Sequence, residues 1–219
     1  MNTMLPVVAL SFAGTCSFAQ SIMMYDNWTP PLPGRTVLNS VLRVGRDEIG
    51  DDLNLTNYQD GFIDGMGWTI ANLSTTNQIT SYRERLTWID RDTSQILGSV
   101  TYGGEPLREP IPPGARFRVD IPSSSVRVPV RPRMYFTIQY FDVVGASVDD
   151  IGLLYGGPTT VGSSSRFIRN FTTGQDIDLG GSNQNLGFYI RVRPIPAPGV
   201  CAAGLFAFGA LATRRRRSP

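Results

Sequence analysis

The strongest constraint on the fold of this chain is a period-two alternation of apolar and polar residues. In Arg116–Ile121, apolar and charged residues alternate strictly, and a later stretch repeats the pattern with Phe188, Ile190 and Val192 on one face. Alternation of this kind indicates a β-strand with one buried and one solvated face. No long segment shows the 3.6-residue period of an amphipathic helix.

Short strand-like segments recur along the middle of the chain and are separated by glycine- and proline-rich turns such as Gly103-Gly104. Further candidates are 36–44, 53–57, 66–73, 80–89, 95–102, 134–143, 151–155 and 166–171. About ten short strands without a helical pattern predict an all-β fold, an antiparallel β-sandwich with jelly-roll-like connections. The apolar segment Met134–Val143 is expected at the centre of a sheet. Prolines at 122, 129 and 132 predict a sheet edge.

Composition removes several classes of function. The chain has 219 residues with no histidine, and all 20 of its basic residues are arginines. Arg214 to Arg217 account for four of them, so the stretch 20–199 carries 16 arginines against 18 acidic residues. A near-neutral middle of this kind argues against a nucleic-acid partner. Serine or cysteine triads, lysine-based catalysis and histidine-rich zinc sites lack their usual residues.

Carboxylate chemistry remains open to such a chain. Paired carboxylates hydrolyse glycosides, and acidic residues are available for it: Asp51, Asp52, Glu84, Asp90, Asp149 and Asp150. Scattered surface acids balanced by arginine are the simpler interpretation. We therefore expect no enzyme activity, with a carboxylate-based glycoside hydrolase as one alternative.

A cluster of oxygen donors in GDDLNLTNYQDGFIDG raises the question of calcium. Asp51, Asp52, Asp60 and Asp64 are candidate ligands, since Ca²⁺ prefers hard oxygen donors on loops. The spacing does not match an EF-hand loop. Asp60-Gly61 and Asp64-Gly65 also suit turns, and Asp51-Asp52 suits a turn before a strand. We expect no bound cofactor, with these four residues as the weak calcium candidates.

Three tryptophans offer a possible carbohydrate-binding surface. Trp28, Trp68 and Trp88 would stack on sugar rings if they were exposed on a sheet face. Trp88 shares its strand face with Leu86, however, and this predicts that both point inward. A carbohydrate-binding module that uses these residues is the second alternative.

The N-terminal 19 residues have the pattern of a secretory signal peptide. An apolar stretch, Met4–Ala13, precedes Ser17-Phe18-Ala19, which fits the small-x-small pattern before a cleavage site. Cleavage by signal peptidase is expected between Ala19 and Gln20. A buried N-terminal strand or helix is the alternative interpretation.

The C-terminal residues 195–219 contain three consecutive parts: Pro196-Ala197-Pro198, an uncharged run over 200–213, and Arg214-Arg215-Arg216-Arg217. As a helix the 14-residue run would span about 21 Å, less than the roughly 30 Å hydrocarbon core of a bilayer. The arginine cluster is expected to stay cytoplasmic. Cys16 and Cys201 both lie in the terminal apolar runs.

These three parts together resemble the PEP-CTERM sorting signal of bacterial exosortase substrates, with Ala197 where that family usually has Glu. Tyr25-Asp26-Asn27 and the segment 48–53 are similar, more loosely, to the start of exported β-sandwich proteins that bear such tails. The resemblance implies export, temporary insertion of the tail into the membrane, and proteolytic transfer to the cell surface or matrix by an exosortase-type enzyme. A simple single-span tail anchor is the alternative.

The expected organisation is therefore a signal peptide over 1–19 with an N-terminal signal helix, a β-sandwich over 20–194, and a sorting tail over 195–219 with an apolar helix. The expected role is non-enzymatic, structural or adhesive, at the cell surface or in the extracellular matrix. Extracellular polysaccharide is the expected kind of partner.

Overall fold

Nearly all of the alternating segments form β-strands in the computed structural model, which describes residues 20–26, 40–122, 127–156, 161–165, 167–180 and 185–195. These residues belong to one compact unit, Gln20–Ile195. Its strands are β1 (Ile22–Asp26), β2 (Ser40–Arg43), β3 (Ile49–Asn54), β4 (Gly61–Asn72), β5 (Ser81–Asp90), β6 (Ile96–Gly103), β7 (Arg116–Pro122), β8 (Arg133–Val144), β9 (Ile151–Tyr155), β10 (Phe167–Asn170), β11 (Asp176–Asp178) and β12 (Phe188–Pro194). One 3₁₀ turn, η2 (Val148–Asp150), precedes β9.

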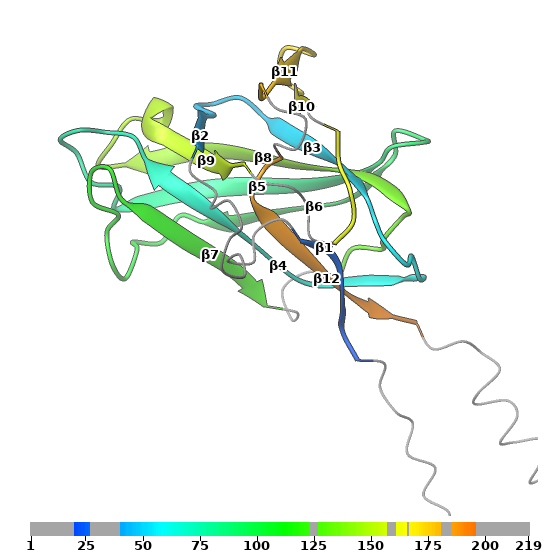
Figure 1. The fold of residues 1–219 in the computed structure, drawn as a ribbon. Coiled ribbons are helices and arrows are strands. Elements are labelled where there is room, and N and C mark those ends of the chain that lie inside the picture. The colour runs from blue at the N-terminus through cyan, green and yellow to red at the C-terminus, as the bar shows by residue number, and fades with distance from the viewer. Residues whose placement is uncertain are drawn as a thin grey trace, which may run out of the picture. The chain divides into compact units, whose positions relative to one another are not determined.

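The strands form two antiparallel sheets, consistent with a β-sandwich (Figure 1). In the first sheet the order is β1-β12-β4-β9-β2, and β7 pairs with β4. In the second sheet the order is β11-β10-β3-β8-β5-β6. The long strand β8 lies between β3 and β5, so its predicted central place is confirmed.

The core lies between the two sheets and is built from one face of each strand. Phe136 of β8 contacts Trp88 of its own sheet at a centroid distance of 5.8 Å. It also contacts Phe188 and Trp68 of the first sheet, at 5.2 and 6.3 Å. Large apolar residues at alternate positions therefore meet across the sandwich, as the period-two pattern predicted.

The sequence interpretation of Asp51-Asp52 as a turn before a strand is wrong. Both residues lie inside β3, paired with Phe136 and Tyr135 of β8, and both are buried. Successive strand residues point to opposite faces, so Asp51 enters the core and Asp52 faces outward. The local sequence around these two aspartates also fits a turn, so it could not show that both are buried.

Asp64-Gly65 is likewise part of a strand rather than a turn. Arg191 of β12 pairs with Gly65, and the next residue, Val192, pairs with Ile63. Asp64 is thus the extra residue of a β-bulge within β4.

Proline marks a sheet edge, as predicted. Within the described part of the chain, β7 pairs with β4 and with no other strand, and it ends at Pro122. Pro129 makes a single bridge to Phe62, and residues 127–132 form no regular strand.

The predicted signal helix over 1–19 and the apolar helix over 200–213 lie outside the described residues, as does the sorting tail from Pro196 onward. Among the helices of the described residues, none combines the length and apolarity that crossing a bilayer requires.

Candidate functional site

Two of the three tryptophans proposed for sugar stacking are buried in the core. Trp68 is 2% exposed and Trp88 is fully buried. The prediction that Trp88 and Leu86 share an inward face is confirmed, because Leu86 is fully buried as well. Neither tryptophan can form an exposed stacking surface, so the binding hypothesis is corrected for both. Trp28 lies outside the described residues.

Glu84 is an acid inside the sandwich. It lies on the inward face of β5, 2% exposed, and one of its carboxyl oxygens, Oε2, has no hydrogen-bond partner. Burial raises the pKa of Glu84 to about 8, although hydrogen bonds with Trp68 and Tyr140 oppose the shift. The Trp68 indole N–H also donates to the Tyr140 hydroxyl at 3.2 Å. Burial therefore favours the protonated form of Glu84 at neutral pH.

Asp51 is a second buried acid, on the inward face of β3. Its Oδ2 accepts a hydrogen bond from the Leu186 backbone N–H at 3.1 Å, and its Oδ1 has no partner. Burial raises the pKa of Asp51 well above its ordinary value, the Leu186 hydrogen bond opposes this, and the charge of Asp52 adds to it.

The two buried acids are too far apart to act as a hydrolytic pair. Asp51 is paired with Phe136 of β8, and Glu84 is paired with Tyr140 of the same strand. Four residues along a strand span about 13 Å. Glycosidase carboxylates lie about 5 to 9.5 Å apart.

The four calcium candidates do not come together. Asp51 lies in the core, and Asp52 lies on the opposite face of β3. Asp64, at the β4 bulge, pairs with Arg193 at 3.0 Å and accepts a hydrogen bond from Ser21. Asp60 is exposed and accepts a hydrogen bond from the Tyr58 hydroxyl at 2.7 Å. Across the residues that the structure describes, no group of three or more acids is arranged to hold a metal ion.

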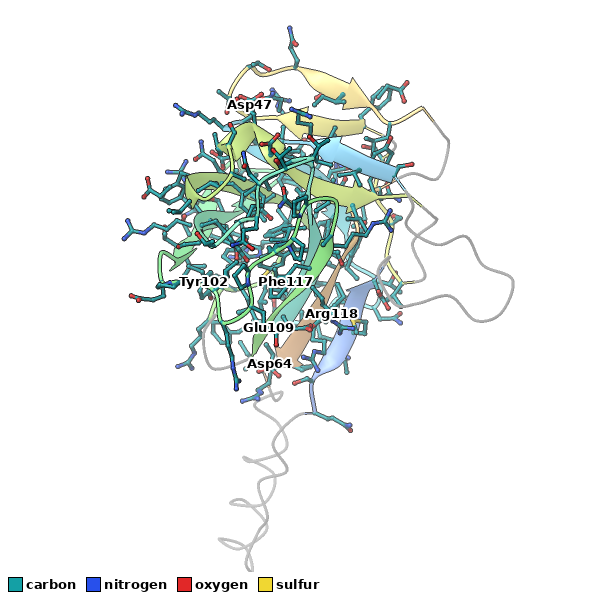
Figure 2. The ribbon with its side chains drawn as sticks, turned by 90° about the vertical axis from the view of Figure 1, so that its left-hand side faces the viewer. Asp47, Asp64, Tyr102, Glu109, Phe117 and Arg118 are labelled. Atoms are coloured by element: carbon teal, nitrogen blue, oxygen red, sulfur yellow. The ribbon has the colours of Figure 1, made fainter. Side chains whose placement is uncertain are left out.

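Figure 2 labels two acidic side chains that lie at opposite ends of the unit, Asp47 and Asp64. Asp47 lies at the end near β10 and β11, where it accepts a hydrogen bond from the Asn170 side chain at 2.7 Å. Asp64 lies at the opposite end, where β12 and β4 meet.

A polar cavity of about 240 Å³ lies on the outer face of the second sheet. Its lining comes from five segments: Asp52 on β3, Arg91 after β5, Tyr135 on β8, Ser165, Phe167 and Arg169 at β10, and Asp176 on β11. Asp52 and Tyr135 are direct cross-strand partners, and so are Arg169 and Asp176. The outward face of neighbouring strands therefore brings these side chains together.

The lining of this cavity contains an ion pair between a buried carboxylate and a half-buried arginine. The Asp52 side chain is 5% exposed and forms a salt bridge with Arg91, whose side chain is 29% exposed. Oδ1 of Asp52 also accepts hydrogen bonds from the Ser165 backbone N–H at 2.8 Å and the Ser165 hydroxyl at 2.7 Å. These contacts compensate the burial of the carboxylate.

Aromatic rings support the guanidinium groups of the cavity. Arg91 lies over Tyr135 at 5.7 Å from the ring centroid, and Arg169 lies over Phe171 at 5.8 Å. Tyr135 and Phe171 meet edge to face at 5.4 Å. Both arginines are thus held in place by contacts typical of cation–π pairs.

A larger hollow, of about 530 Å³, lies against the other end of β8. Polar side chains that line this hollow form hydrogen bonds or ion pairs with one another or with neighbouring residues. The Gln139 side chain donates to the Arg46 carbonyl at 2.9 Å and accepts from Arg85 at 2.6 Å, while Asp142 pairs with Arg83 at 3.4 Å. The smaller cavity is the better candidate site, because it brings the exposed Arg169 and Asp176 beside the hydrogen-bonded Asp52.

Sequence reasoning named Asp52 as a candidate residue but missed the rest of this cavity. The one local signal is Tyr135, an aromatic residue at an outward position of the strand Met134–Val143. Comparison with known proteins adds no assignment, since no protein-family model and no curated protein matches this chain.

Proposed function

We propose that the chain is an exported, non-enzymatic protein of the cell surface or extracellular matrix, with a structural or adhesive role. The observation that carries this proposal is the three-part C-terminal sequence: Pro196-Ala197-Pro198, an uncharged run, and Arg214 to Arg217. Its resemblance to the PEP-CTERM signal supports sorting by an exosortase-type enzyme. The apolar stretch and cleavage pattern before Gln20 give the matching orientation, with the sandwich outside.

The fold within this proposal is a jelly roll. The nested strand pairs β1–β12, β3–β8, β4–β7 and β5–β6 support it. One long hairpin wound into two facing sheets would have this nested pairing, and this favours a jelly roll. Such sandwiches present broad outer faces for contact with a matrix.

The geometry of the acids supports a non-enzymatic role. Asp51 and Glu84 lie on separate parts of the core at a separation larger than glycosidases use. Asp51 and Asp52 are adjacent in sequence, but they face opposite sides of β3.

Deletion of Arg214 to Arg217 tests the proposal. The positive charges are expected to hold the tail at the cytoplasmic face, so their loss should release the protein past the membrane into the medium. Cell fractionation and immunoblotting of the full chain and of the deletion variant measure this. A matched control replaces the four residues with lysines, which keeps the charge and should keep the retention. Unchanged cell association after the deletion would count against a sorting role for the tail.

A further inference from the structure

We propose that the cavity formed by Asp52, Arg91, Tyr135, Phe167, Arg169 and Asp176 binds a neutral sugar unit of a polysaccharide. This deepens the adhesive role proposed above and rests on it for its biological setting. It moves the expected polysaccharide contact from the buried tryptophans to the outer face of the second sheet.

Two groups of the site are held in position before a ligand arrives. Asp52 is fixed by Arg91 and by two hydrogen bonds from Ser165. Arg91 is in turn fixed against Tyr135. A ligand that meets groups already held in position loses less conformational freedom on binding, and this favours affinity.

The lining also places hydrogen-bond donors beside hydrogen-bond acceptors. The guanidinium groups of Arg91 and Arg169 only donate hydrogen bonds, and the Asp176 carboxylate only accepts them. Each hydroxyl of a sugar does both, so it can bridge a guanidinium and a carboxylate. Arg169 and Asp176 are cross-strand partners on β10 and β11, which places the two kinds of group side by side.

An exposed aromatic ring forms part of the lining. Phe167 is 38% exposed, and it is the one aromatic side chain in the described residues that counts as an exposed large apolar group. It lines the cavity together with the half-buried Tyr135. An apolar ring beside a few convergent polar groups is the usual composition of a small-molecule site, and it suits the C–H face of a pyranose.

The charge and the size of the cavity favour a single neutral sugar unit. The lining contains two arginines and two aspartates, so its formal charge is zero. An acidic sugar would gain no net attraction there, whereas a neutral sugar needs none. The volume of about 240 Å³ is below the roughly 300 Å³ at which drug-sized sites begin. The cavity therefore suits one sugar unit of a longer chain.

The experiment is affinity electrophoresis of the full-length protein, purified in detergent, through gels that contain a soluble polysaccharide. The neutral probes are mixed-linkage β-glucan, galactomannan and arabinoxylan, and the acidic probe is polygalacturonate. The test variants are Phe167→Ala and Arg169→Ala. Their matched controls are Ile96→Ala, at an exposed apolar residue of β6, and Arg83→Ala, at an exposed arginine of β5. Circular dichroism shows which variants keep the fold.

We expect at least one neutral polysaccharide to retard the protein, with a dissociation constant that changes little between low and high salt. Phe167→Ala and Arg169→Ala should each weaken this binding about tenfold, while Ile96→Ala and Arg83→Ala leave it unchanged.

Three results would overturn the inference. The first is no retardation by any of the neutral probes, and the second is that folded Phe167→Ala and Arg169→Ala variants are retarded as strongly as the natural chain. The third is binding to polygalacturonate alone with a steep salt dependence. Because the assay uses purified protein, its failure leaves the export proposal standing. Failure of the Arg214–Arg217 deletion experiment, conversely, leaves the binding site standing.

Discussion

Among single residues, Glu84 has the clearest physical consequence, because an acid in an aromatic core couples folding to protonation. Its pKa is about 8 in the folded chain against an ordinary value of 4.5. Between these two values the folded chain binds more protons than the unfolded chain. The contribution of Glu84 to stability is therefore fully present below about pH 4.5, falls as the pH rises, and is lost above about pH 8.

We expect Glu84→Gln to remove this dependence. An uncharged amide of similar shape pays no cost of ionisation inside the core, so the variant should gain stability over the natural chain at pH 9 and not at pH 5. The gain should be on the order of a few kcal/mol. Urea unfolding at pH 5, 7 and 9 measures it. A variant whose stability falls between pH 5 and 9 as steeply as that of the natural chain would contradict the role of Glu84.

Between elements, the contact of β3 with the segment after β10 depends on Gly50. A Cβ atom at this position would lie 2.6 Å from Cε2 of Phe171 and 2.8 Å from Cγ2 of Thr137. Phe171 is the ring that supports Arg169 and meets Tyr135. The missing side chain of Gly50 thus lets Phe171 lie close over β3, beside the cavity.

Gly50→Ala should therefore destabilise the chain by about 1–3 kcal/mol, the usual cost of overpacking. It should also weaken any sugar binding, because Phe171 must move. Thr101→Ala, at an exposed position of β6, is the control and should change stability by less than about 0.5 kcal/mol. Chemical unfolding of both variants at neutral pH gives the comparison. A Gly50→Ala variant as stable as the control would mean that Phe171 is not held as described.

The sequence alone predicted those strands whose two faces differ in polarity. The alternation in Arg116–Ile121 and at Phe188, Ile190 and Val192 depends only on the order of neighbouring residues, so the sequence alone was enough to recognise it. Strand β3 was not recognised in this way, because its segment IGDDLN contains two aspartates. Aspartates are ordinarily found in turns, whereas these two are buried. Their burial depends on partners distant in sequence, Arg91 for Asp52 and Leu186 for Asp51.

The candidate site was largely beyond sequence reasoning for the same reason. Its residues come from five segments between Asp52 and Asp176, and only strand pairing brings them together. Tryptophan side chains can stack on sugar rings, but large aromatic residues also pack in the cores of proteins. The ring contacts of Trp68 and Trp88 with Phe136 show that both tryptophans belong to the core.

At the level of the whole molecule, stability should not depend on divalent metal. The four aspartates first considered for calcium lie in different surroundings, and two of them are bound by arginines. Addition of EDTA should therefore leave the melting temperature unchanged within about 1 °C, a shift well below 1 kcal/mol for a domain of this size. Differential scanning fluorimetry with and without EDTA measures it. A clear drop that calcium restores would show that a metal contributes to the fold.

We propose that the chain is exported and sorted through its C-terminal tail. Intact-mass and terminal-peptide mass spectrometry of the protein from its native host test this proposal. We predict a mature chain that begins at Gln20, ends near Pro196 to Gly199, and lacks Arg214 to Arg217. A mature chain that still carries the four arginines would mean that the tail is a retained anchor or an ordinary terminus, and would contradict the sorting proposal.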